Sequence, residues 1–145
     1  MADRFRLGFR QVDLLPTVTI TAAAAGVLST AVTDLLAMTA LHVQAVFTYG
    51  SGGTSLTCYI QTSFDVGTTW FDIMCFAFTT ASATRISSVR TATAVAANYT
   101  ATDATLTDNT IKDGLLGDRV RVKYTSVGTY ASTTLRIFGM AKGVY

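Results

Sequence analysis

The residue types that usually carry catalysis or bind metals form no recognisable motif in this sequence. The single histidine, His42, lies in an alternating segment with no cysteine or glutamate at metal-ligand spacing. Zinc takes three or four nitrogen, sulfur or oxygen ligands, so His42 is expected to be a core or surface residue. A Ser-His-Asp triad would need a serine and an acid from elsewhere, and no nucleophile-elbow motif supports one.

The two cysteines, Cys58 and Cys75, flank a segment with turn chemistry at Asp65-Val-Gly67. If the chain turns there, the cysteines fall about opposite one another on adjacent strands, where opposed Cβ atoms lie roughly 4.5–5.5 Å apart. A relaxed disulfide has a Cβ separation of roughly 3.8 Å, so free thiols are expected and a bridge is the alternative. No signal peptide is recognised, so a reducing cytosol is the expected site of folding.

The acidic residues suggest calcium binding and glycoside hydrolysis, and both have simpler explanations. Four aspartates lie five residues apart, at Asp103, Asp108, Asp113 and Asp118. This spacing matches no EF-hand loop, so a solvated surface loop is expected. Asp65 and Asp72 could form a glycosidase pair, but Asp65 suits a turn and Asp72 lies beside Trp70 in a strand-like run. We therefore expect no enzyme, no cofactor and no metal site.

The composition is apolar for a soluble monomer of this size. Of 145 residues, 50% are hydrophobic and only 14% are charged, and the mean hydropathy is +0.40. Polar residues such as Asp34 and His42 interrupt the most apolar window, 22–47, whereas a bilayer span needs roughly 18–20 consecutive apolar residues. A net charge of +2 is too small to indicate nucleic-acid binding without a basic patch. We expect a protein that assembles with partners and with itself, away from membranes.

Alternation of apolar and polar residues is the main structural signal along the chain, and it predicts strands. A short helix is expected over residues 32–41, and a long polar loop over 98–117. The expected strands cover residues 17–21, 41–49, 56–63, 69–78, 85–90, 119–125 and 133–140. This pattern predicts an all-β fold, an antiparallel β-sandwich or a jelly-roll-like barrel with an extended N-terminal arm.

Residues 1–16 are expected to form that arm, ahead of a single domain over residues 17–145. The arm alternates cationic and aromatic side chains, which are types enriched in protein interfaces. It is either a frayed terminus or a segment that reaches a neighbouring subunit. In the second case the contact residues are Arg4, Phe5, Arg6, Phe9 and Arg10.

Two segments resemble parts of a known class of protein. Residues 61–73, QTSFDVGTTWFDI, resemble the Q-x-S-x-D-G-G-x-T-W-x-D-I hairpin of small structural proteins from tailed bacteriophages and related particles. Residues 117–124, GDRVRVKY, and the runs at 133–137 and 141–143 resemble the G-D-R-x-R-V strand and the final strand of the same proteins. The resemblance covers roughly residues 56–143, and Val66 stands where the motif has glycine.

The resemblance implies a β-sandwich structural protein of the virion, assembled in the host cytoplasm. It implies a non-enzymatic capsid decoration (cement) protein, or a head-spike or neck component, whose partners are the major capsid protein or other virion proteins. Two alternatives stay open. One is a carbohydrate-binding β-sandwich module in which Trp70 and Tyr99 stack on sugars, and the other is a tail or neck completion protein that forms a ring.

Overall fold

The computed structural model describes residues 7–144, and every regular element among them is a β-strand. The strands are β1 (Leu7–Ile20), β2 (Ala24–Leu28), β3 (Ala40–Thr48), β4 (Ser51–Gly52), β5 (Ser55–Thr62), β6 (Phe71–Phe78), β7 (Ala83–Arg90), β8 (Val120–Val127), β9 (Tyr130–Ala131) and β10 (Thr133–Val144). The expected all-β fold is confirmed. No helix that could cross a membrane occurs in this part of the chain.

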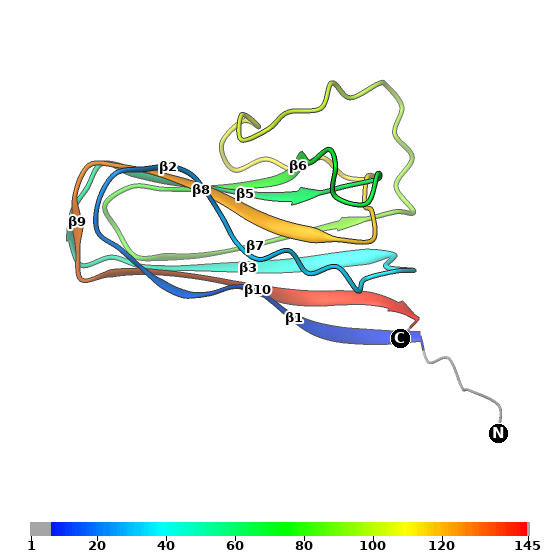
Figure 1. The fold of residues 1–145 in the computed structure, drawn as a ribbon, viewed down its shortest axis with the longest axis horizontal. Coiled ribbons are helices and arrows are strands. Elements are labelled where there is room, and N and C mark those ends of the chain that lie inside the picture. Colours follow the sequence, from blue (N-terminus) through cyan, green and yellow to red (C-terminus); the bar gives the residue numbers. More distant parts are fainter. Residues whose placement is uncertain (1–6, 145) are drawn as a thin grey trace.

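Two four-stranded antiparallel sheets form the sandwich (Figure 1). Sheet A has the order β1-β10-β3-β7, and sheet B has the order β2-β8-β5-β6. The short strands β4 and β9 pair with each other at one end of the molecule. The antiparallel sandwich predicted from the alternating pattern is therefore confirmed.

The core lies between the two sheets and follows from the period-two alternation of the strands. In β8, Val120, Val122 and Tyr124 are buried, whereas the residues between them are half-buried. Residues of β10 such as Leu135 and Ile137 meet them from sheet A within one hydrophobic cluster. Alternation of this kind places one face of each strand inside, against the facing sheet.

The N-terminal boundary at residue 16 does not match the structure. Strand β1 begins at Leu7 and pairs with β10 from Leu7 opposite Val144 to Ile20 opposite Thr133. Val12 and Leu14 are buried in the core, so residues 7–16 belong to the sandwich. Pro16 is tolerated because it lies at a register shift between Leu15 and Val18 in an edge strand. Arg4, Phe5 and Arg6 lie outside the described residues.

The helix predicted for residues 32–41 is wrong. The backbone of Val32 exchanges hydrogen bonds of 2.9 and 3.0 Å with Val120. The Leu35 amide then donates to the Asp118 carbonyl at 3.1 Å. Pairing with the segment that leads into β8 satisfies these amides in an extended conformation, so tertiary contacts override the local helix preference.

The long segment between β7 and β8 folds over sheet B and pairs with β6 (Figure 1). The Asp72 amide donates to the Thr102 carbonyl at 2.9 Å, and the Cys75 amide donates to the Thr110 carbonyl at 3.0 Å. Residues 98–117 contain no strand, as the polar composition predicted. Because this segment covers β6, nearly every residue of β6 is buried.

Candidate functional site

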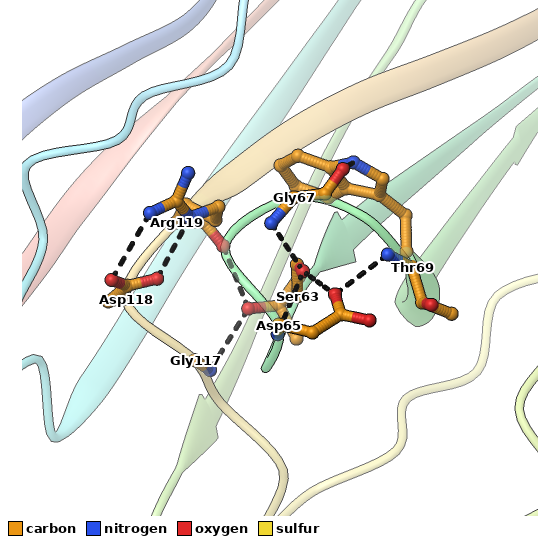
Figure 2. Close-up of polar contacts among 9 residues, drawn as sticks. Ser63, Asp65, Gly67, Thr69, Gly117, Asp118 and Arg119 are labelled. Carbon is orange, nitrogen blue, oxygen red and sulfur yellow. Dashed lines mark hydrogen bonds and ion pairs between the residues drawn. The ribbon is translucent and has the colours of Figure 1, made fainter.

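The turn between β5 and β6 is organised by one serine and one aspartate (Figure 2). Ser63 Oγ accepts a hydrogen bond from the Gly67 amide at 2.9 Å and donates to Asp65 Oδ1 at 2.8 Å. The same carboxylate oxygen accepts from the Thr69 amide at 2.7 Å. The donors from Thr69 and Ser63 stabilise the ionised form and lower the pKa of Asp65 to about 2. Asp65 is thus a turn former, as the sequence indicated.

The two segments that carry the resemblance meet at this turn (Figure 2). The Gly117 amide donates to Thr62 Oγ1 at 3.0 Å, and that hydroxyl donates to the Arg119 carbonyl at 2.8 Å. Asp118 and Arg119 form an ion pair of 2.9 Å beside it. A Cβ atom on Gly117 would lie 2.0 Å from the Ser63 carbonyl oxygen, so only glycine fits this approach.

Asp72 is a buried structural anchor for the loop that follows β7. Its side chain is fully buried, and its Oδ1 accepts from Gln61 Nε2 at 2.8 Å and from the Ala104 amide at 2.9 Å. Its Oδ2 accepts from the Thr102 hydroxyl at 2.8 Å and also from two further amides of the loop, those of Thr105 and Leu106. These hydrogen bonds explain why a carboxylate is buried at position 72. A catalytic pairing with Asp65 is not needed to explain its burial.

Gln61 connects this anchor to the charged residues on the outer face of sheet B. Its Nε2 also donates to Asp103 Oδ1 at 2.7 Å, and its Oε1 accepts from Arg121 Nε at 2.9 Å. Lys123 Nζ lies 2.9 Å from the same Asp103 oxygen. The donors from Gln61 and Lys123 lower the pKa of the Asp103 carboxyl, and burial lowers the pKa of Arg121.

Trp70 completes the wall of a cleft beside this network. Its indole Nε1 donates to the Gly67 carbonyl at 2.9 Å, and the Arg121 guanidinium lies 4.4 Å from its ring centroid. The ring is half-buried. The cleft has a volume of about 530 Å³, and its lining residues are Gly67, Thr68, Thr69, Trp70, Ala101, Thr102, Asp103 and Arg121.

Compared with protein family models, curated proteins and solved structures, the chain has no match.

A second candidate surface is the outer face of sheet A. Its exposed or half-buried apolar and aromatic residues include Phe9 on β1, His42 and Val46 on β3, Ile86 on β7, and Phe138 and Met140 on β10. Met140 pairs with His42, and Phe138 with Gln44, which pairs with Ile86. The rings of Phe9 and His42 are 5.7 Å apart. No other described segment covers this face in Figure 1.

Of the five residues expected to contact a partner, the structure describes Phe9 and Arg10, and these two lie on different faces of β1. Phe9 is 55% exposed on the outer face of sheet A. Arg10, one residue along the strand, makes an ion pair of 2.8 Å with Asp34 and donates to the Asp34 carbonyl at 3.0 Å. Adjacent residues of a strand point to opposite faces, so Phe9 and Arg10 do not form one contact surface. His42 is a surface residue, one of the two positions expected for it.

The two cysteines are free and buried, but they are not opposite one another. Gln61 pairs with Asp72, and a bulge after Ile60 then shifts the register, so Cys58 pairs with Phe76 and Tyr59 with Cys75. This one-residue shift turns the two thiols to opposite faces of sheet B. Cys58 belongs to the main core, whereas Cys75 packs with Tyr59 and Leu106. Burial raises the pKa of Cys75 to about 11.

The four spaced aspartates have separate partners. Asp103 bonds to Gln61 and Lys123, and Asp118 pairs with Arg119. Asp113 accepts from the Arg90 amide at 2.7 Å, and Asp108 lies near the Cys75 thiol. Within residues 7–144, no group of three or more histidine, cysteine or acidic side chains could hold a metal ion.

Sequence reasoning identified Trp70 as a possible sugar platform but missed the residues that lie around it. Gln61, Asp103 and Arg121 belong to three different segments, β5, the long loop and β8. The alternating pattern of residues 119–125 predicted that Arg121 lies on the charged face of a strand. Its pairing with Gln61 depends on the β5–β8 register, which no local pattern specifies.

Proposed function

We propose that this chain is a non-enzymatic structural protein of a tailed-phage virion, a decoration (cement) protein that binds and stabilises the assembled head. The observation that carries the proposal is the uncovered outer face of sheet A, which exposes Phe9, Ile86 and Met140. Large apolar side chains gathered on one face are typical of a protein–protein contact. The partner is the major capsid protein, and the place of action is the virion.

The site around the β5–β6 turn supports the same proposal in another way. The two segments that resemble phage structural proteins, 61–73 and 117–124, lie against each other through Thr62, Ser63 and Gly117. The resemblance therefore concerns one structural unit, in which a turn is held against the entry to β8. The buried side chains of Thr62, Ser63 and Asp72 in this unit form hydrogen bonds with backbone groups of the turn and the neighbouring segments.

A cement protein stabilises a shell because it binds the assembled lattice and not the loose subunits. The test mixes the purified protein with heads assembled from the major capsid protein of the encoding virus, and separately with unassembled subunits. Sedimentation should recover the protein with the heads only, and heads that carry it should melt at a higher temperature. Equal binding to both forms, or binding to neither, would contradict the proposal.

The uncovered face of sheet A also fits a second candidate, a tail or neck completion protein, which would form a ring through the same face. Self-association is part of both candidates. Light scattering after size exclusion, across a range of concentrations, separates them by native mass. A stable trimer favours the decoration role at a local threefold axis, and a stable hexamer favours the ring.

A further inference from the structure

We propose that the cleft beside Trp70 binds a saccharide, specifically an uncharged pyranose unit. The cleft lies on the outer face of sheet B, because Arg121 and Gln61 pair across β8 and β5 and both point away from the core. The outer face of sheet A is on the opposite side of the sandwich (Figure 1). The proposal therefore does not rest on the role of the chain in a virion.

The polar groups of the cleft are held in fixed positions. Arg121 is held by its hydrogen bond to Gln61 and by its contact with the Trp70 ring. The hydrogen bond to Gln61 uses Nε of Arg121. The two terminal nitrogens of Arg121 form no hydrogen bond with any other residue among 7–144. A guanidinium held in this way presents donors in a rigid fork, so it can meet two neighbouring hydroxyl groups with little loss of side-chain entropy.

A hydrogen-bond acceptor, the Asp103 carboxylate, lies beside these donors. Asp103 Oδ1 is occupied by Gln61 and Lys123, whereas no described residue donates to Oδ2. The Asp103 side chain is 56% exposed, and depression of its pKa keeps it ionised. A sugar hydroxyl both donates and accepts, so adjacent hydroxyls can use Asp103 and Arg121 together.

The lining of the cleft has balanced charge and a mixed surface. The charged residues that line the cleft are one aspartate and one arginine, so their formal charges cancel and neither an anion nor a cation is favoured. Trp70 adds an aromatic ring to a mainly polar lining, and Thr68, Thr69 and Thr102 add hydroxyls. The volume, about 530 Å³, lies within the range of small-molecule sites. An uncharged ring with apolar C–H edges and several hydroxyls matches this lining.

The tryptophan makes the proposal directly measurable, since the chain contains only one. Fluorescence of the full-length protein is recorded while methyl glucoside, methyl galactoside, methyl mannoside or N-acetylglucosamine is added. We expect a saturable change for at least one of them, with a Kd on the order of 1 mM. Absence of a saturable change with all four would overturn the proposal.

Two variants and one matched control locate the binding. Arg121→Gln should weaken the affinity at least about tenfold, and Ala101→Phe, at an exposed lining position, should block the cleft without disturbing the core. Arg136→Gln makes the same arginine change on the exposed side of sheet A and should leave the affinity unchanged. Binding that survives Ala101→Phe, or that is lost equally in Arg136→Gln, would also overturn the proposal.

Discussion

Val66 occupies a left-handed backbone conformation, with a φ of 60°, at the position where the resembling phage motif has glycine. A β-branched side chain in this region is strained by roughly 1–2 kcal/mol, and the side chain is 75% exposed, so little packing offsets the cost. We predict that Val66→Gly raises the free energy of unfolding by about 1 kcal/mol. Urea denaturation measures this change.

The control for that prediction is an exposed valine with an ordinary backbone conformation. Val127 is 49% exposed at the end of β8 and is absent from the positive-φ residues. Val127→Gly should lower stability by about 0.5–1 kcal/mol, because glycine has more conformational freedom to lose. If both substitutions destabilise the protein equally, the account of strain at Val66 is wrong.

Asp65 gives the β5–β6 turn a defined dependence on pH. Its pKa is lowered from 3.8 to about 2 by donors from Thr69 and Ser63. A group whose folded pKa is depressed stabilises the fold above its unfolded pKa, and this contribution is lost as the pH falls through the folded pKa. We therefore expect the turn to loosen as the pH falls from about 4 to about 2.

Trp70 reports this loosening, because its indole bonds to the Gly67 carbonyl within the turn. Its fluorescence should change between pH about 4 and about 2 in the native protein. In Asp65→Asn the same transition should be missing, because the titrating carboxyl is gone. A transition of equal size in that variant would show that another group is responsible.

The β5–β6 hairpin and the entry to β8 are joined through Gly117. A methyl group there would meet the Ser63 carbonyl oxygen at 2.0 Å, so Gly117→Ala should separate the two segments and cost about 1–3 kcal/mol. Gly8→Ala is the matched control, since nothing lies within 4 Å of a Cβ atom at Gly8. Thermal unfolding of both variants tests the prediction, and an equal effect on Tm would contradict it.

The elements that the sequence predicted correctly are those whose alternation is strong and local. The hairpin was visible because Asp65 and Gly67 separate two runs suited to a half-buried sheet. The pairing of β5 with β6 beyond the bulge at Ile60 was not predicted. The alternation of apolar and polar residues does not indicate where a bulge shifts the register. The segment around Leu35 was read as helix because its long-range pairing partners near β8 are remote in the sequence.

The sequence predicted the candidate site residues less well where a site depends on segments that are distant in the chain. Phe9 was identified from residue type alone and lies on an exposed face. Arg10 was grouped with it, although strand alternation sends it to Asp34 on the other side. The cleft beside Trp70 depends on Asp103 and Arg121, which a loop without local structural signals brings together.

The two outer faces of the sandwich differ. The long loop after β7 covers part of sheet B and anchors on Asp72, whereas Ile86 on sheet A is 71% exposed. The buried Asp72 carboxylate accepts hydrogen bonds from several loop amides and so holds the loop against sheet B. The uncovered face of sheet A is therefore the one available for the capsid contact that we propose.

The measurement that tests this account most directly is sedimentation of assembled heads with two matched variants. Ile86→Glu places an acid on the outer face of sheet A, and Leu28→Glu makes a similar change at a 51% exposed position of sheet B. Ile86→Glu should weaken head binding at least about tenfold, because a buried, unpaired charge opposes the contact. Leu28→Glu should bind as the native protein does. If Ile86→Glu binds heads normally, or if both variants lose binding equally, the outer face of sheet A is not the docking surface.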